Sequence, residues 1–546
     1  MTRPIGVLGV FFTVALVGAC ADKDFFEDPD GGVSWEWGTG PCQAGTKQCS
    51  GNAVQICEGG AYKHLKNCNS PQVCSSTLGD CADCEPALLK CVGDVVHNCN
   101  AQGKVGAVIK TCPAGTCSSG QCVDPCAQAK ESKSYIGCTY WPAVTANAGL
   151  VEDFEFAVAV ANAGNGSANV TVASQSNPSL ANVTVAAKSV ATIKLPWVAG
   201  LKLKSNTFIS VLQPAGAYKL TSTRPVTVYQ FNALDYKLNH DCKKGTDQIP
   251  NDNLCYSYSN DASLLLPEHA LGTEYMVLSR PTMVIKATGQ MLKSPGFFSV
   301  VAARPGTTKV SITFKGNTMA GNAGIRAYKK GETAAFSLKQ WEVFQILSET
   351  PASCTTAKTD SNGYGYCDLS NTADLTGTTI KADAAVAVYS GHNCVFVPFD
   401  KWACDHLEEA IFPTSAMGKR YIGSHTISSG KDPSLYRVVS ASGENIISFD
   451  PAVHPTKKLG GGEWFEFTST QDFEVKGTGR FALVKFMVGQ NYSNTKPGAG
   501  APGDPAMALA VPVEQYRTSY YFLAPASYEK NYVNIHAPST ANVKLD

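Results

Sequence analysis

The sequence predicts an all-β protein in which tandem β-sandwich-like modules follow two small disulfide-rich repeats. Three observations support this fold class. Twelve of the 21 cysteines lie between Cys42 and Cys122. From about residue 134 onward, apolar and polar residues alternate with the period of two that half-buried strands require. Gly and Pro separate these short runs, as they separate the strands of a sandwich.

The N-terminus is typical of a lipoprotein signal. Arg3 precedes an apolar run over residues 5–16, which is shorter than the roughly 20 residues that span a bilayer. Small residues then lead into Cys20, and this resembles the bacterial lipobox, whose cysteine carries the lipid. We therefore expect residues 1–19 to be a signal peptide and Cys20 to be the membrane anchor. An ordinary cleaved signal is the alternative.

Residues 20–40 are acidic and rich in Gly towards their end, which predicts a flexible tether. The residue after Cys20 is Ala21, not Asp, and the common sorting rule then favours the outer membrane. We expect an extracytoplasmic, lipid-anchored protein at the outer membrane or cell surface. Trp35 and Trp37 lie in this tether and are expected to be exposed, whereas most of the other tryptophans are expected in cores.

The charge balance argues against a nucleic-acid partner. The chain has 45 basic and 45 acidic residues, and only 16% of its residues are charged. No global field attracts a polyanion. The partners expected are a membrane, through the lipid, and an unidentified surface protein or glycan.

The cysteine count supports the lipid assignment. With Cys20 lipid-bound, 20 cysteines remain, an even set that indicates disulfides in an oxidising compartment. Residues 41–125 hold two six-cysteine repeats, 42–81 and 84–122, and the first three cysteines of each are separated by six and then seven residues. Three disulfides per repeat is the simplest pairing, although the connectivity stays open. A zinc site at Cys81 and Cys84 is the rival interpretation.

The remaining cysteines form four close pairs. Each pair closes a loop of roughly a dozen residues, which stabilises a fold by on the order of 3 kcal/mol. The predicted disulfides are Cys126 with Cys138, Cys242 with Cys255, Cys354 with Cys367, and Cys394 with Cys404.

A weak repeat runs through residues 126–546. Three sequence marks recur. In the aromatic mark, an aromatic residue opens a strand and an Ala follows five residues later. In the strand–turn–strand mark, apolar residues of two successive strands are six residues apart, and in the Pro–Tyr mark a Pro precedes a Tyr by eight residues. The aromatic mark is at Phe156, Phe298, Tyr436 and Tyr532, the strand–turn–strand mark at Leu220/Val226, Ile380/Val386 and Val475/Phe481, and the Pro–Tyr mark at Pro267/Tyr275, Pro413/Tyr421 and Pro512/Tyr520.

These marks predict modules at about 126–255, 256–400 and 401–495, and a partial one at 506–546. The partial module lacks its closing strand pair, so we expect either that the chain is cut short or that its strands complete an earlier sheet. Seven or eight short strands per module favour a β-sandwich, and a propeller-like arrangement of the repeats is the alternative.

Five segments of this region carry recognisable structural motifs, namely residues 135–141, 226–232, 260–267, 271–275 and 404–409. These segments resemble the IgGFc-binding protein N-terminal domain family. The resemblance lies in structural motifs, not catalytic ones, and covers roughly residues 130–546. It implies an extracellular binding or adhesion role and says nothing about the ligand.

A search for catalytic motifs finds none of the common hydrolase, metalloprotease or phosphate-binding patterns. The densest polar cluster is Cys404-Asp405-His406-Leu407-Glu408-Glu409. Its His could be a general base or a metal ligand, but a structural role at a module boundary is the favoured interpretation. Two acidic groups, Glu152-Asp153-x-Glu155 and Asp241 with Asp252, are more simply loop residues than calcium ligands. We therefore expect no catalytic residues, no metal and no cofactor.

The leading hypothesis is a non-enzymatic surface lipoprotein with a binding or adhesion role. A structural component of a surface layer or sheath is the second hypothesis. A polysaccharide-acting enzyme is the third, and it requires a cleft with two carboxyl groups roughly 5 to 9.5 Å apart.

Overall fold

The computed structural model describes eleven stretches of the chain, which form two compact units. The first unit ends at Thr111 and also includes Ser118–Gln121, and the second contains the other described residues. Cys20, Cys242 and Cys255 lie outside the described residues, as do Trp35 and Trp37. The described stretches are 42–113, 116–131, 134–204, 207–238, 256–257, 259–287, 289–426, 432–489, 492, 504–524 and 531–545.

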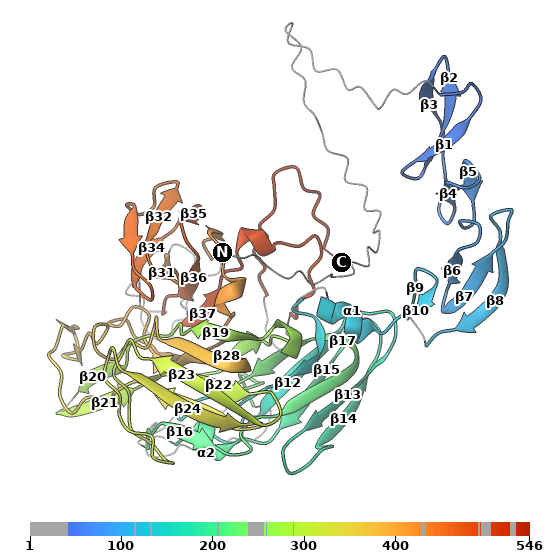
Figure 1. The fold of residues 1–546 in the computed structure, drawn as a ribbon. Helices are drawn as coiled ribbons and strands as arrows, with labels where there is room; N and C mark the ends of the chain where they lie inside the picture. The colour runs from blue at the N-terminus through green and yellow to red at the C-terminus, as the bar shows by residue number, and fades with distance from the viewer. Residues whose placement is uncertain are drawn as a thin grey trace, which may run out of the picture. The chain divides into compact units, whose positions relative to one another are not determined.

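The N-terminal unit consists of small antiparallel sheets joined by disulfides (Figure 1). Few of its side chains are buried, so cross-links replace a core, as is usual for units of this size. A short ribbon of β9 (Cys117–Ser118) and β10 (Gln121–Cys122) follows. The strands of this unit are β1 (Lys47–Ser50), β2 (Ala53–Glu58), β3 (Ala61–Asn67), β4 (Val73–Ser75), β5 (Asp80–Ala82), β6 (Leu89–Val92), β7 (Val95–Cys99) and β8 (Val105–Thr111).

The second unit is built from two-layered β modules, as the alternating pattern predicts. We call residues 126–255, 256–400 and 401–495 the first, second and third module. The first module begins with α1 (Pro125–Glu131). Its strands run in the order β14-β13-β17-β12-β15, and β11 also pairs with β17. The remaining elements of this module are β11 (Gly137–Tyr140), β12 (Phe156–Asn162), β13 (Ala168–Ala173), β14 (Ala181–Val185), β15 (Ser189–Leu195), α2 (Ala199–Lys202), β16 (Val211–Gln213) and β17 (Lys219–Phe231).

The second module repeats this plan around β28. The order is β16-β25-β22-β28-β23-β24, so β16 from the first module completes this sheet. A side sheet has the order β21-β20-β27-β26. The elements are β18 (Ala262–Leu264), η1 (Glu268–Ala270), β19 (Gly272–Met276), β20 (Met283–Ala287), β21 (Gln290–Ser294), β22 (Gly296–Ala302), β23 (Thr307–Thr313), β24 (Thr333–Lys339), β25 (Val343–Leu347), β26 (Lys358–Thr359), β27 (Gly365–Tyr366) and β28 (Thr379–Val395).

The third module consists of two four-stranded sheets. One has the order β30-β35-β32-β33 and the other β34-β31-β36-β37. Its elements are β29 (Asp405–Ala410), η2 (Thr414–Ala416), β30 (Arg420–Gly423), β31 (Ser434–Ser440), β32 (Asn445–Asp450), β33 (Lys457–Leu459), β34 (Trp464–Ser469), β35 (Phe473–Gly477) and β36 (Phe481–Met487), followed by β37 (Ala506–Leu509) and η4 (Val513–Gln515).

The strand–turn–strand pattern has a different outcome in different modules. In the first two modules each predicted pair is one long strand, β17 or β28, so the expected turn is wrong there. The first part of β17 pairs with β13 and its last part with β12, so one strand passes from one layer of the sandwich to the other. Only in the third module does a turn separate the two halves, as β35 and β36.

The closing strand of each module pairs with the first strand of the segment that follows the module. The closing strands β17, β28 and β36 pair with β18, β29 and β37, so the sheets continue across the sequence boundaries of the modules. We call β18, β29 and β37 the linking strands. Apolar cores are continuous as well, since Phe156 of the first module and Phe297 of the second belong to one buried cluster.

The Pro–Tyr mark corresponds to a recurring turn. After the Pro comes a 3-10 turn, and then an amide that donates to the Tyr hydroxyl three residues later. The donor is Gly272 for Tyr275 at 2.8 Å and Gly418 for Tyr421, but Arg517 for Tyr520. A Cβ at Gly272 would lie 2.5 Å from the Cβ of Pro413 in the next turn. The same close approach joins Gly137 to Pro267 and Gly418 to Pro512. Glycine is therefore required where consecutive modules pack together.

The C-terminal part is less regular than the sequence predicts. The marks at Tyr532 and Val543 predict strands, but the structure assigns no helix or strand to the described residues after Gln515. Strands of the preceding modules are held between neighbours, and 531–537 has no such neighbour among the described strands. The expected strands are therefore wrong for this segment.

Candidate functional site

Most of the cysteines singled out in the sequence are bonded locally. In the N-terminal unit, Cys42–Cys57 and Cys84–Cys99 have the same separation of 15 residues. Cys91 and Cys117 are disulfide-bonded as well. The other bonds are Cys49–Cys74, Cys68–Cys81, Cys112–Cys122, Cys126–Cys138, Cys354–Cys367 and Cys394–Cys404.

The polar motif at residues 404–409 forms the linking strand β29 and is almost entirely buried. Glu408 and His406 are 0% exposed. The Glu408 carboxylate accepts a hydrogen bond from the Gln230 amide at 2.5 Å and one from Asn232 at 3.2 Å, and Thr145 also donates to it. These three partners belong to the first module. The motif therefore ties the first module to the linking strand that follows the second.

Further carboxyl groups gather around β29. We call Asp261, Asp405, Glu408, Glu409 and Asp504 the carboxylate cluster, and its members come from or beside all three linking strands. Asp261 accepts from the Glu408 amide at 2.7 Å. Burial raises the pKa of Asp261, Asp405 and Glu409 well above their usual range, and mutual repulsion adds to this.

Asp504 is the most peripheral member of the cluster. Asp504 is an exposed residue as a whole, yet desolvation of its carboxyl, which is hydrogen-bonded to Asp405, raises the pKa of Asp504 to about 6. Two carboxyl groups in such contact share a proton. Asp261, Asp405 and Glu409 therefore keep their protons at pH values at which isolated carboxyl groups have lost them.

The cluster has some features of an active site but lacks the geometry of one. His406 stacks on Phe297 with ring centroids 5.9 Å apart, and its Nδ1 has no partner among the described residues. Because Glu408 and His406 are inaccessible, no substrate can reach them in this conformation. Within the described ranges, no three His, Cys, Asp or Glu side chains are arranged to hold a metal ion.

A second buried polar group joins the second and third modules, and the sequence search missed it. Arg437 on β31 is 1% exposed. It donates to Asp374 at 2.9 Å and bonds Glu466 at 2.8 Å, while Arg280 also bonds Glu466 at 2.6 Å. The Arg437 guanidinium lies 3.8 Å from the centroid of the Trp464 ring. The sequence contained one signal for this group, because an Arg within the otherwise apolar run 435–439 indicates a buried charge that needs a partner.

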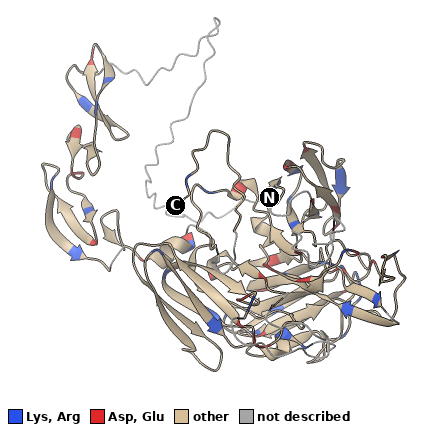
Figure 2. Ribbon diagram, turned by 180° about the vertical axis from the view of Figure 1, so that it is seen from behind, with Lys and Arg blue, Asp and Glu red and all other residues tan. Residues whose placement is uncertain are grey.

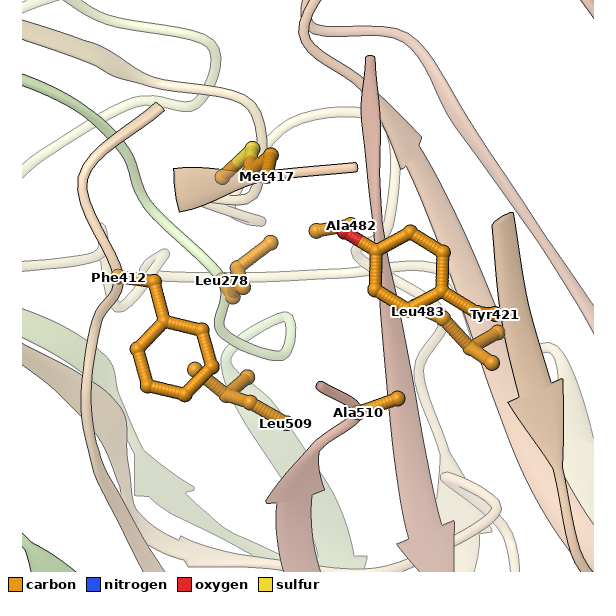
Figure 3. Close-up of a pocket in the computed structure, with 8 residues that line it drawn as sticks. All are labelled: Leu278, Phe412, Met417, Tyr421, Ala482, Leu483, Leu509 and Ala510. Atoms are coloured by element: carbon orange, nitrogen blue, oxygen red, sulfur yellow. The ribbon is translucent and has the colours of Figure 1, made fainter. Parts of the chain in front are cut away.

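Two hollows of the described structure are poor substrate sites. The first is an apolar cavity of about 10 Å³, enough for about one water, and Figure 3 shows that only the Tyr421 hydroxyl brings a polar side-chain atom to it. The second is larger but contains a single carboxylate, Asp124. Neither holds the pair of carboxyl groups that a glycoside hydrolase needs. The first cavity is lined by Leu278, Phe412, Met417, Tyr421, Ala482, Leu483, Leu509 and Ala510.

The surface of the described residues is electrically mixed. Basic and acidic residues are interspersed along the ribbon (Figure 2), and the whole chain has 45 of each. Trp141 is buried as expected, whereas Trp402 is 39% exposed, so not every tryptophan outside the predicted tether lies in a core. No described helix is long and apolar enough to cross a membrane.

Exposed apolar side chains gather towards the C-terminus. Such gatherings are typical of interaction surfaces in soluble domains. This part of the chain still contacts the modules, because the Tyr521 amide donates to the Tyr135 hydroxyl at 2.9 Å and Asn534 donates to Ser424 at 2.9 Å. The exposed residues are Val511, Tyr520, Tyr521, Phe522, Tyr532, Val533, Ile535, Val543 and Leu545.

These observations define a disulfide-bonded, all-β protein whose polar clusters support the joins between packed modules. The family model described as IgGFc binding protein matches residues 261–546, more than half of the chain. The chain therefore belongs to the IgGFc binding protein family.

One curated relative is the IgGFc-binding protein of Homo sapiens. It is 28% identical over 207 residues, which cover 38% of this chain and 3% of the human protein. The chain thus corresponds to a small fraction of the length of that relative. No solved structure matches this chain.

Proposed function

We propose that this protein is a non-enzymatic binding protein on the outer surface of a cell, anchored through lipid on Cys20, that contacts an extracellular protein through its β modules. The observation that carries the proposal is the match of the IgGFc binding family over residues 261–546. The binding function in that family's name describes recognition, not turnover.

The chemistry of the described residues supports this proposal. Disulfides such as Cys354–Cys367 and Cys394–Cys404 persist in oxidising surroundings outside the cytoplasm. The polar motif that could have acted as a base is buried between modules. The joined β modules, in a chain whose proposed lipid anchor lies near its N-terminus, suit presentation of a surface to a partner.

A binding experiment tests this function directly. The full chain, purified in detergent, would be applied to arrays of extracellular proteins and of glycans, with heat-denatured protein as the control. Saturable binding to one or a few proteins is expected. Binding to glycans without binding to any protein would show that the partner is a glycan, not a protein. An absence of binding on both arrays would overturn the proposal. Self-association without any added partner would favour a surface-layer component instead.

A further inference from the structure

We propose that the outer edge of β34 is a docking site for an extended segment of a partner polypeptide, which adds to the sheet as one more strand. This deepens the proposed function, on which it rests, by assigning the partner's conformation and contact site. Strand addition to a free sheet edge is a general mode of peptide recognition. Figure 1 shows β34 in the orange third module.

The third module repeats the geometry of the second around this strand. In the second module β25 pairs with β22, and Phe298 lies opposite Ile346. In the third, β34 pairs with β31, and Tyr436 lies opposite Phe467. Because Phe298 and Tyr436 carry the same repeat mark, β25 and β34 are equivalent strands.

In the second module the equivalent edge is already occupied. Strand β16 pairs antiparallel with the outer edge of β25, with Leu212 opposite Phe344. This short strand belongs to the first module, so the edge accepts an extended segment from outside its own module. The same edge of β34 pairs with no described strand, since β34 ends the order β34-β31-β36-β37.

A local difference explains why the chain itself leaves β34 open. The segment that precedes β28 is the counterpart of β16. It turns back onto its own module instead, since the Thr372 carbonyl accepts from Asn317 at 2.7 Å and the Ala373 carbonyl accepts from Thr282 at 3.0 Å. The backbone of this segment therefore does not pair with β34, although its Asp374 side chain reaches Arg437 on β31.

The register identifies the backbone groups that point outward. The Ser440 amide bonds the Glu463 carbonyl at 2.9 Å. In an antiparallel ladder the bonded residues then alternate, so Phe465 and Phe467 direct their backbone groups to β31. The amides and carbonyls of Trp464, Glu466 and Thr468 point to the outer edge, as those of the equivalent Val343 and Gln345 point to β16.

The edge of β34 lacks the residues that usually protect such edges. Protective edges carry Lys or Pro, and in the first module the corresponding strand β15 carries Lys194, which is ion-paired with Glu155. Strand β34 has the sequence Trp-Phe-Glu-Phe-Thr-Ser. Its single charge, Glu466, faces Arg280 and Arg437 and is neutralised there.

A group of aromatic side chains beside this edge offers an apolar surface to the side chains of the docked strand. Phe465 and His454 have ring centroids 4.6 Å apart, and Phe449 lies 5.1 Å from Phe467. All four are partly buried at the margin of the third module's core. On the equivalent edge, Leu212 packs against the second module's core. The docked strand should therefore run antiparallel to β34 with an apolar residue opposite Phe465.

A peptide that copies β16 is the probe that tests this site. A fluorescent peptide of residues 208–214, Phe-Ile-Ser-Val-Leu-Gln-Pro, would be titrated against the full chain by anisotropy. Thr468→Pro removes an outward amide and leaves the ladder to β31 intact, so it should weaken binding about tenfold or more. Thr468→Ala keeps that amide and should bind as the wild type does. Hydrogen exchange should slow at 464–468 on binding and stay unchanged at 189–195.

Each alternative result has a definite meaning. No binding by the wild-type chain up to about 1 mM peptide, or equal binding by Thr468→Pro and Thr468→Ala, would overturn the site. A dimer that Thr468→Pro abolishes, without peptide binding, would assign the edge to a second copy and also overturn it. Failure of the protein array with peptide binding intact would remove the proposed function and leave this site in place.

Discussion

The hydroxyl of Tyr275 donates a hydrogen bond of 2.7 Å to the carbonyl of Val386 and accepts one from the Gly272 amide. The third module has the same arrangement, with Tyr421 bonded to Phe481 at 2.6 Å, and Tyr140 bonds Val226 in the first. One buried phenol per module therefore fastens the Pro–Tyr turn to the closing strand.

Tyr275→Phe should destabilise the fold by about 1–2 kcal/mol, because a buried amide and a buried carbonyl lose their partner. Urea unfolding followed by tryptophan fluorescence would measure the change. The matched control is Tyr520→Phe, since Tyr520 holds the corresponding place but is 49% exposed; it should change stability by no more than about 0.5 kcal/mol. Equal effects at both positions would contradict the role given to the buried phenol.

Arg437→Leu should be far more harmful. It leaves Asp374 without its ion-pair partner and Glu466 with Arg280 alone, in a buried site where breaking a pair costs about 3–5 kcal/mol. The comparison variant is Arg420→Leu, because Arg420 is 51% exposed and its pair with Glu474 lies at the surface. We expect at most about 1 kcal/mol from that variant. A small loss for Arg437→Leu in chemical denaturation would show that the buried group does not join the modules.

The free energy of unfolding should depend on pH through the carboxylate cluster. A carboxyl group whose pKa is raised in the fold loses its stabilising contribution as the pH rises, whereas an ion-paired carboxylate loses it as the pH falls. The pKa of Asp504 rises from 3.8 to about 6 in the fold, so the folded state holds this proton more tightly than the unfolded state. Its contribution is complete below 3.8 and is lost as the pH rises to about 6.

Asp504→Asn removes this titration, and the amide resembles the protonated acid. The variant should gain stability relative to the wild type as the pH is raised through that window, and urea midpoints at several pH values would measure the difference. A constant difference between the two proteins would show that Asp504 ionises freely in the fold.

Lipidation at Cys20 is tested in cells. Cys20→Ala should abolish incorporation of labelled palmitate and release the protein from the membrane fraction, because a single signal segment without lipid gives no lasting anchor. Cys42→Ala removes a disulfide partner of Cys57 and should leave labelling intact. Continued labelling of the Cys20→Ala protein would contradict the anchor.

The sequence and the structure agree best where local chemistry decides. Alternation of apolar and polar residues identified strands such as β13 (Ala168–Ala173) and β23 (Thr307–Thr313), because a strand with one buried face repeats every two residues. Close spacing brought Cys354 and Cys367 together in the structure, since a short loop holds the two thiols near each other. The marks also aligned the three modules, and the family match over residues 261–546 agrees with the resemblance that those segments suggested.

Other predictions depended on distant partners and could not be read from spacing. The turn expected inside β17 and β28 is absent because those strands cross between two layers, which depends on how the sheets pack. Strands were expected at 532–545, yet a strand needs neighbours, and the described structure offers none there. Arg437 was not singled out in the sequence. The motif of Glu408 was expected to have a structural role at a module boundary, but its partners in the first module could not be read from spacing.

The sequence by itself determined the all-β class, the disulfide-rich beginning and the recurring modules, since these follow from side-chain periodicity and the spacing of cysteines. Only the tertiary structure decided which side chains of the first module the densest polar motif contacts, and that β25 is covered whereas β34 is open. Burial and edge exposure are properties of how segments more than a hundred residues apart come together, and no local pattern contains them.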